Sequence, residues 1–187
     1  KTFGNFDRRF RRGVVKAIED WVDAFCKSGG RGCPSVLLYS DGFGVGKTHL
    51  AVATANRVLD DWQVSPEYNA CPVRFESGPG LVRRIRATYN VPPEQRESHE
   101  TEEMVYRQLR SVKLLILDDL GKEKPSDHTR EVYFYLIDER MKLGLPVFIT
   151  SNLPLEAGDA AAPSLGPLIG EATVSRLIEM CQGRYYK

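Results

Sequence analysis

The sequence predicts an α/β domain in which helices cover both faces of a five-stranded, mostly parallel sheet, giving three layers. Three observations support this prediction. Short apolar runs typical of buried strands alternate along the chain with segments of helical periodicity. A glycine-rich loop at residues 42–48 ends in Gly-Lys-Thr and separates the first apolar run from a helical segment. A later apolar run ends in the acidic pair Asp118 and Asp119, which is typical of a strand in a parallel sheet.

The first half of the chain alternates helix, strand and helix. Apolar residues recur every three to four positions in 14–25 and predict a helix, and a glycine-rich turn at 28–34 leads into a strand at 35–39. The loop at 42–48 opens a helix at 49–60, which we expect to bury Leu50, Ala51, Ala53 and Val58. A polar stretch at 60–72 precedes a short strand at 73–75, and a helix follows at 81–89.

The second half repeats the alternation. A loop around two prolines at 90–98 separates the previous helix from one at 102–110. The nearly continuous apolar run at 112–117 predicts a strand, and a helix at 126–143 is closed by Gly144. A further buried strand is expected at 146–150, followed by a loop rich in Gly, Ala and Pro at 154–167, a helix at 171–180 and a last strand at 184–186.

Length and composition indicate one globular domain. The 187 residues are enough for a single core, and the 42% hydrophobic and 27% charged content is ordinary. A formal net charge of +1 gives no overall attraction to nucleic acid or membrane, so an anionic partner must meet a local patch. No apolar run approaches the roughly 20 residues of a membrane helix and no signal peptide is visible, so we expect a cytoplasmic protein without a membrane partner.

The cysteines do not indicate a metal site. They form no Cys-x-x-Cys pair, and no two histidines have ligand spacing, so free thiols are expected rather than a zinc centre. The first residue is Lys1 rather than methionine, so we expect residues 1–187 to be one domain of a longer protein.

The loop at 42–48 has the chemistry of a P-loop. Glycines let backbone N–H groups converge on phosphates, and the N-terminus of the following helix adds unpaired N–H groups and a positive dipole end. Lys47 is expected to reach the β- and γ-phosphates and Thr48 to offer its hydroxyl to Mg²⁺. Asp41 stands where the first glycine usually lies, which we interpret as a shifted loop entry; a glycine-rich hairpin without ligand is the alternative. The predicted nucleotide-binding residues are Gly42, Phe43, Gly44, Val45, Gly46, Lys47, Thr48 and His49.

The acidic pair supplies the second half of the predicted site. Ligands of parallel α/β sheets bind at the carboxyl ends of the strands, so the pair is expected beside the P-loop. Asp118 would hold Mg²⁺, directly or through water, and Asp119 would polarise the attacking water as a base. The alternative is that both aspartates merely end a strand at a turn.

Two further polar residues are candidates for the site. Asn152 follows the strand at 146–150 and could hydrogen-bond the water or the γ-phosphate as a sensor, although asparagine is also common in turns. Arg176 lies in the helix at 171–180 and could project into a neighbouring subunit's nucleotide. On its residue type alone, a solvated or ion-paired helix arginine is the better interpretation of Arg176.

The motifs together resemble the AAA+ ATPase domain of bacterial DnaC/DnaI-type helicase loaders and of the related IstB transposition ATPases. The likeness covers nearly the whole chain in the right order, and the Asp-Asp-Leu-Gly form of the acidic motif is more specific than a P-loop alone. The matching runs are Thr2-Phe3-Gly4-Asn5-Phe6-Asp7, Gly44-Val45-Gly46-Lys47-Thr48-His49-Leu50-Ala51, Leu115-Ile116-Leu117-Asp118-Asp119-Leu120-Gly121-Lys122-Glu123, Asp138-Glu139-Arg140, Thr150-Ser151-Asn152-Leu153 and Val174-Ser175-Arg176-Leu177.

The resemblance implies an AAA+ core that uses ATP or ADP with Mg²⁺ and assembles side by side into a ring or spiral. It implies that Arg176 acts in trans as an arginine finger, that Asn152 is the sensor and that Asp119 is the catalytic acid. Many AAA+ proteins have Glu at that position, so the shorter Asp119 implies slow hydrolysis that suits a switch. We expect no C-terminal lid domain after Arg176, and no N-terminal helicase-binding region in this chain. The implied partners are a replicative DNA helicase and single-stranded DNA.

The DNA-binding candidates are Arg83, Arg84 and Arg86 on the helix at 81–89. Arg83 and Arg86 are three residues apart and share a face, while Arg84 lies around the side. In the loaders that the chain resembles, a helix in this region touches single-stranded DNA. A solvated amphipathic helix is the equally weighted alternative, and the arginines of residues 8–12 are a second candidate patch.

Three other functions compete with a helicase loader. The nearest is a transposition helper ATPase of the IstB kind, which would grip duplex DNA and a transposase. A P-loop kinase for a small metabolite is disfavoured by Asp118, Asp119 and Asn152. An interaction module that binds nucleotide without turnover is the third.

Overall fold

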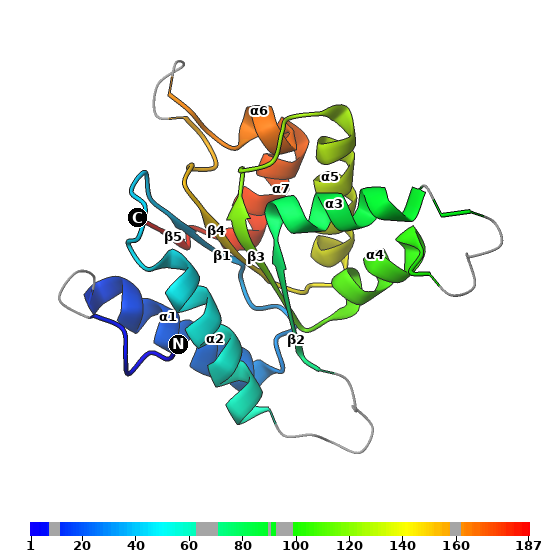
Figure 1. Cartoon of the computed structure of the whole chain (residues 1–187). Helices are drawn as coiled ribbons and strands as arrows, with labels where there is room; N and C mark the ends of the chain where they lie inside the picture. The colour runs from blue at the N-terminus through cyan, green and yellow to red at the C-terminus, as the bar shows by residue number, and fades with distance from the viewer. Residues whose placement is uncertain (8–11, 63–70, 90, 93–98, 158–161) are drawn as a thin grey trace.

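In the computed structural model, residues 1–7, 12–62, 71–89, 91–92, 99–157 and 162–187 are described. The domain has three layers, in which helices cover both faces of one five-stranded sheet, as Figure 1 shows. This confirms the predicted fold class. The elements are α1 Arg12–Ser28, β1 Val36–Tyr39, α2 Lys47–Asp61, β2 Val73–Ser77, α3 Gly78–Tyr89, α4 Glu102–Ser111, β3 Leu114–Leu120, α5 Asp127–Lys142, β4 Val147–Ser151, α6 Gly166–Ile169, α7 Glu171–Cys181 and β5 Tyr185–Tyr186.

All four strand pairs are parallel, in the order β2-β3-β4-β1-β5. The carboxyl ends of β1, β3 and β4 therefore lie at one edge of the sheet, with β4 between the other two. The β3–β4 register slips between Leu117 and Leu120, where Leu117 pairs with Ile149 but Leu120 pairs with Ser151. The slip falls at Asp118 and Asp119, as bulges beside functional sites commonly do.

Strand residues alternate between two apolar clusters, one on each face of the sheet. Leu114 and Ile116 pack with buried residues of α1 and α2, whereas Leu115 and Leu117 pack with α3, α4, α5 and α7. In Figure 1, α1 and α2 accordingly lie on one side of the sheet and the other helices on the opposite side. Both faces of the central strands are buried, which explains why β3 is continuously apolar from Leu114 to Leu117 rather than alternating.

The main differences from the expected elements concern β3, β2, α3 and α6. β3 begins at Leu114 and continues through the acidic pair to Leu120, because pairing resumes beyond the bulge. β2 continues to Ser77 and α3 begins at Gly78, so strand and helix follow each other without the expected loop. The short helix α6 lies inside the segment expected to be a loop. Its N-cap residue Leu165 and its last residue Ile169 are both buried in the core.

The buried Arg140 of α5 joins three elements at the amino-terminal edge of β3 and β4. Its guanidinium is 0% exposed and donates to the carbonyl oxygens of Leu109 at 2.6 Å, Val112 at 2.9 Å and Pro146 at 2.6 Å. Longer bonds at 3.4 Å reach the carbonyls of Arg110 and Lys113. Burial lowers the pKa of Arg140 to about 9, which leaves the group charged at pH 7. Arg140 thus ties the end of α4 to the starts of two strands.

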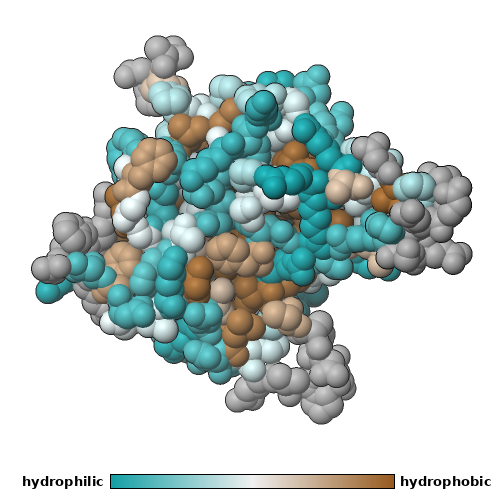
Figure 2. All heavy atoms as spheres, in the orientation of Figure 1, coloured by the Kyte–Doolittle hydropathy of each residue, from teal (hydrophilic) through white to brown (hydrophobic). Residues whose placement is uncertain are grey.

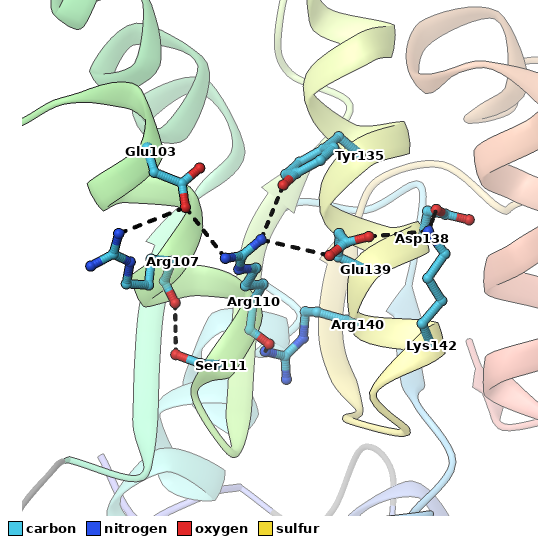
Figure 3. A network of polar contacts seen from close by, with 9 residues as sticks. All are labelled: Glu103, Arg107, Arg110, Ser111, Tyr135, Asp138, Glu139, Arg140 and Lys142. Carbon is cyan, nitrogen blue, oxygen red and sulfur yellow. Dashed lines mark hydrogen bonds and ion pairs between the residues drawn. The ribbon is translucent and has the colours of Figure 1, made fainter.

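A second arginine holds the outer side of the same junction. Arg110 of α4 contacts Glu103 at 3.3 Å, the hydroxyl of Tyr135 at 3.2 Å and Glu139 at 3.7 Å, as Figure 3 shows. Arg140 lies beside this network and below it in the same view. The network therefore links α4 to α5 on the surface, while Arg140 links them in the interior.

The face drawn in Figure 2 is mostly hydrophilic, with apolar surface gathered over the region between α2 and β2. Leu59 of α2 and Phe75 of the edge strand β2 are large apolar side chains that remain 44% and 38% exposed. Within the described residues, no helix has the length and apolar character needed to cross a lipid bilayer.

Candidate nucleotide-binding site

The loops after β1, β3 and β4 enclose a cavity of about 370 Å³ at the carboxyl edge of the sheet. The sheet order explains the convergence, because β4 lies between the two strands that carry the P-loop and the acidic pair. Of the predicted residues, the P-loop from Phe43 to His49, Asp119 and Asn152 all line this cavity. The full lining is Lys1, Phe43, Gly44, Val45, Gly46, Lys47, Thr48, His49, Asp119, Lys122 and Asn152.

The P-loop leads directly into α2 with its first amides free of side-chain caps. Gly46 is the N-cap residue with φ 95°, a left-handed conformation, and a Cβ there would come within 2.5 Å of the Phe6 ring. Only glycine suits this position for both reasons. The uncapped N-terminus of a 15-residue helix offers N–H groups and a positive dipole end to an anion.

Lys47 bends back over its own loop. Its Nζ donates to the carbonyl oxygens of Ser40 at 3.1 Å and Gly42 at 3.0 Å. Burial lowers the pKa of Lys47; Asp119 opposes this effect, and the nearby positive charge of Lys122 adds to it. Asp41, the departure from the usual P-loop, lies exposed at the loop entry with its carboxylate 3.4 Å from Lys187. Asp41, which stands in place of the usual glycine, therefore does not prevent the hydrogen bond from Lys47 to the Gly42 carbonyl.

Thr48 and Asp118 face each other across the loop. The Thr48 hydroxyl donates to both carboxylate oxygens of Asp118, at 3.0 and 3.1 Å. Thr150 of β4 donates its hydroxyl to the same carboxylate at 2.5 Å. A hydroxyl and a carboxylate are the hard oxygen ligands that Mg²⁺ takes, usually completed by waters and substrate phosphates. Among the described residues there is no cluster of three His, Cys, Asp or Glu side chains that could hold a metal alone, so phosphate oxygens would have to complete the shell.

Asp119 is held in an unusual backbone conformation. Its φ is 60°, which costs about 1–2 kcal/mol for a residue with a Cβ, although Asp and Asn tolerate it best. The Asp119 N–H donates to the Thr150 hydroxyl at 2.9 Å, and the side chain forms an ion pair with Lys122 at 2.8 Å. Thr150 therefore orients both aspartates, because its hydroxyl accepts from the Asp119 N–H and donates to the Asp118 carboxylate.

Two predicted residues have further roles in the geometry. Asn152 follows β4 and lines the cavity beside Asp119 and Lys122. His49 also lines it, but its Nε2 lies 3.0 Å from the Thr2 carbonyl and 2.9 Å from Asn5 Oδ1. The His49 side chain therefore anchors the N-terminal segment to α2.

Arg176 lies apart from this cavity, on α7. Its Nε donates to Asp138 at 2.7 Å, a second nitrogen donates to the Ala172 carbonyl at 3.1 Å, and the guanidinium stacks 4.3 Å from the centre of the Phe134 ring. Arg176 and Lys142 lower the pKa of Asp138, with Lys142 first. The guanidinium is thus held in one orientation at the surface, with the side chain 30% exposed.

The three arginines of α3 do not share one environment. Arg84 points sideways, and its guanidinium binds both oxygens of Glu100, Glu76 at 2.6 Å and Gln108 at 2.8 Å. Its hydrogen bonds join α3 to β2 and α4, so we remove it from the candidate DNA-binding set. Arg83 and Arg86 are exposed, and Arg86 contacts the Ser126 hydroxyl at 3.5 Å. Of the second candidate patch, the arginines of residues 8–12, Arg12 begins α1 and is exposed, and the others lie outside the described residues.

Sequence reasoning missed Thr150 and Lys122 as members of the site. Both belong to motif runs of the sequence, Thr-Ser-Asn and Asp-Asp-Leu-Gly-Lys, in which only neighbouring residues were assigned roles. The signal that could have found Thr150 is its place as the first polar residue after the apolar run Val147-Phe148-Ile149 of β4. The signal for Lys122 is its i, i+3 spacing from Asp119 across a Gly-containing turn.

Comparison with known proteins places the chain among ATP-binding proteins. Residues 35–183 match the family described as IstB-like ATP binding protein. The uncharacterized protein YdaV of Escherichia coli K12 is 27% identical over 173 residues, covering 92% of this chain and 58% of that protein. The replicative helicase loader DnaC of Buchnera aphidicola is 25% identical over 164 residues, covering 88% and 56%. The chain thus spans somewhat more than half the length of these curated relatives.

Solved structures share the fold. The DnaC helicase loader superimposes with a TM-score of 0.69 at 23% identity, covering 100% of this chain and 96% of that one. The replication initiator DnaA bound to AMPPCP and single-stranded DNA gives 0.68 at 16% identity, covering 99% and 48%. With a P-loop, an acidic pair and Asn152 meeting at one edge of a sheet of this topology, the chain belongs to the family of IstB-like ATP-binding proteins and has the AAA+ type of α/β fold.

Proposed function

We propose that this chain is the Mg²⁺-dependent ATPase module of a DNA-replication helicase loader, acting in the cytoplasm and coupling its ATP state to single-stranded DNA and a replicative helicase. One observation carries the ATPase part: Lys47, Thr48, Asp119 and Asn152 come from three separate segments of the chain and line one cavity, and Asp118 is hydrogen-bonded to Thr48. The helicase-loader part rests on the similarity to DnaC.

Each residue has a distinct task in hydrolysis. The amides of the P-loop and Lys47 hold the β- and γ-phosphates. Thr48 and Asp118 would hold Mg²⁺, which when bound neutralises charge on the phosphate oxygens. Asp119 takes a proton from the attacking water, and Asn152 orients that water or the γ-phosphate. The short side chain of Asp119 places its carboxylate farther from the phosphate than a glutamate would, which suits slow hydrolysis and a switch.

Arg176 is proposed to act on the nucleotide of a neighbouring subunit in a ring or spiral. Its side chain is absent from the lining of its own cavity, while Asp138 and Phe134 hold it at the surface. Arginine fingers contribute about 10³–10⁵ in rate. Mixing Arg176→Ala with Lys47→Ala subunits, each inactive alone, is therefore expected to restore part of the phosphate release, because some composite sites regain both residues. Mixed oligomers that form in native mass spectrometry but stay inactive would contradict action in trans.

Arg83 and Arg86 are proposed to contact the phosphates of single-stranded DNA. Each lost phosphate contact should reduce the slope of log affinity against log salt by about 0.7. The Arg83→Ala/Arg86→Ala double variant is expected to flatten the slope by up to ~1.4 for an oligo-dT probe, measured by fluorescence anisotropy across salt concentrations. Arg57→Ala, on α2 at the opposite face of the sheet, is the matched control and should leave the slope unchanged. An unchanged slope in the double variant removes α3 from the DNA surface.

The second candidate is a transposition helper ATPase that grips duplex DNA and a transposase, which the IstB-like family match favours. The two functions predict different partners for the same ATPase site. Pull-down of the full-length parent protein with candidate replicative helicases, with and without ATP, tests the loader. ATP-dependent filaments on duplex DNA, without helicase capture, would favour the transposition helper.

A further inference from the structure

The ammonium group of Lys122 lies against the acidic residue proposed as the base. Lys122 Nζ is 2.8 Å from Asp119 Oδ2, and the pair spans one turn of chain. The Lys122 N–H also donates to the Asp119 carbonyl at 3.3 Å, and Gly121 makes the turn possible with φ 94°. The turn of the backbone at Gly121 therefore holds Lys122 beside Asp119, in addition to the attraction between the two side-chain charges.

The same ammonium group faces the nucleotide cavity. Lys122 lines it together with Lys47, Thr48 and Asn152. Its side chain is 42% exposed, so it has room to move, and its Nζ lies 6.0 Å from the centre of the exposed Phe43 ring on the P-loop. Lys122 thus bridges the β3 side of the cavity and the P-loop side.

The charges around the cavity favour an anion between Lys47 and Lys122. Both side chains line the cavity, and their like charges repel each other. Among the described residues, the Lys47 ammonium donates to two neutral carbonyl oxygens, and the Lys122 ammonium pairs with the Asp119 carboxylate. A terminal phosphate carries more charge than one carboxylate and would relieve the repulsion between both lysines at once.

We propose that Lys122 is the residue by which this site distinguishes ATP from ADP. The α- and β-phosphates lie on the P-loop amides, and only a third phosphate extends to the side of the cavity where Asp119 and Lys122 lie. The Lys122 side chain then moves so that its ammonium group pairs with the γ-phosphate instead of Asp119. This movement leaves the Asp119 carboxylate free to receive the proton of the attacking water. The inference rests on the proposed function, because it assigns a task within the same ATP site.

The test compares the affinities of the chain for AMPPCP and ADP, both with Mg²⁺, by isothermal titration calorimetry. Lys122→Ala is expected to weaken AMPPCP binding about tenfold and to change ADP binding less than twofold, since a charge-assisted contact to the third phosphate is lost. Lys122→Arg should keep most of the AMPPCP affinity. Lys124→Ala removes a nearby exposed lysine that does not line the cavity, so it should bind both nucleotides like the parent.

The outcomes separate this inference from the proposed function. A parent chain that binds neither nucleotide refutes the ATPase proposal itself. A parent that binds both, with Lys122→Ala losing equal affinity for AMPPCP and ADP or losing none, overturns the role of Lys122 alone. A thermal unfolding midpoint equal to that of the parent is expected for Lys122→Ala, because an exposed ion pair contributes about 0–1 kcal/mol.

Discussion

Replacing Arg140 by methionine is expected to lower the free energy of unfolding by about 3–5 kcal/mol. Methionine replaces the apolar stem of the side chain but has no guanidinium, so it leaves the carbonyls of Leu109, Val112 and Pro146 without their donor. Each unsatisfied buried group costs about 1–3 kcal/mol, and the costs are not additive. Since a domain of this size is stable by only about 5–15 kcal/mol, one substitution removes a large share of it.

Removing a buried charge is sometimes neutral, but only when its partners are replaced as well. The partners of Arg140 are backbone carbonyls, which no side-chain substitution removes. Arg140→Lys keeps the charge and three donors without the planar fork, so an intermediate loss is expected. If Arg140→Met does not fold, the loss of stability can still be measured with Arg140→Lys.

Urea unfolding followed by circular dichroism measures the effect. Arg107→Met on α4 is the matched control, because that side chain is 68% exposed and its nearest ion pair, with Glu103, spans 3.9 Å. The control should change stability by less than about 0.5 kcal/mol. An Arg140→Met protein as stable as the Arg107→Met protein would show that the five carbonyls do not need the guanidinium.

Asp119→Asn is expected to slow ATP hydrolysis by about 10²–10⁴ while leaving nucleotide binding intact or tighter. The amide cannot accept the proton of the attacking water. Asparagine is the best choice because it tolerates the φ of 60° at this position, whereas alanine would add backbone strain to the loss of the carboxylate. The hydrogen bond from the backbone N–H to Thr150 is also retained.

Phosphate release and calorimetry on the same preparation separate the two effects. Lys47→Ala serves as the contrasting variant, since loss of the P-loop ammonium is expected to remove both binding and hydrolysis. If the parent hydrolyses ATP and Asp119→Asn does so at the same rate, the base is another group. If both variants lose binding, Asp119 supports the loop rather than the chemistry.

Local sequence patterns predicted most of the secondary structure. The helices α1, α2, α4, α5 and α7 and the strands β1 and β4 lie within a few residues of the expected bounds. These elements carry strong periodicity or continuous apolar runs, so their formation depends on their own residues. The boundary of β3 was wrong by three residues at its end, because the bulge depends on pairing with β4. The short helix α6 was missed because the burial of its flanks depends on distant elements.

The P-loop and the acidic pair were also recognisable in sequence, because phosphate binding needs a fixed order of glycines, lysine and threonine. The roles of single charged residues were not. Arg83 and Arg84 are adjacent and alike in the chain, yet one is exposed and the other is bound by Glu76 and Glu100. Arg140 was named only within the matching run Asp138-Glu139-Arg140, and it is the largest fully buried side chain among the described residues.

The sequence by itself determined that this protein would be a parallel α/β domain with a phosphate-binding loop, since periodicity and glycine spacing act over a few residues. Only the tertiary structure decided which ionisable groups meet. Thr150 orients Asp118 and Asp119, and Thr48 contacts Asp118, because a parallel sheet brings together strand ends that are about thirty to seventy residues apart in the chain. The energy of a charge depends on its neighbours in space and on its distance from water, and neither quantity can be read from its position along the chain.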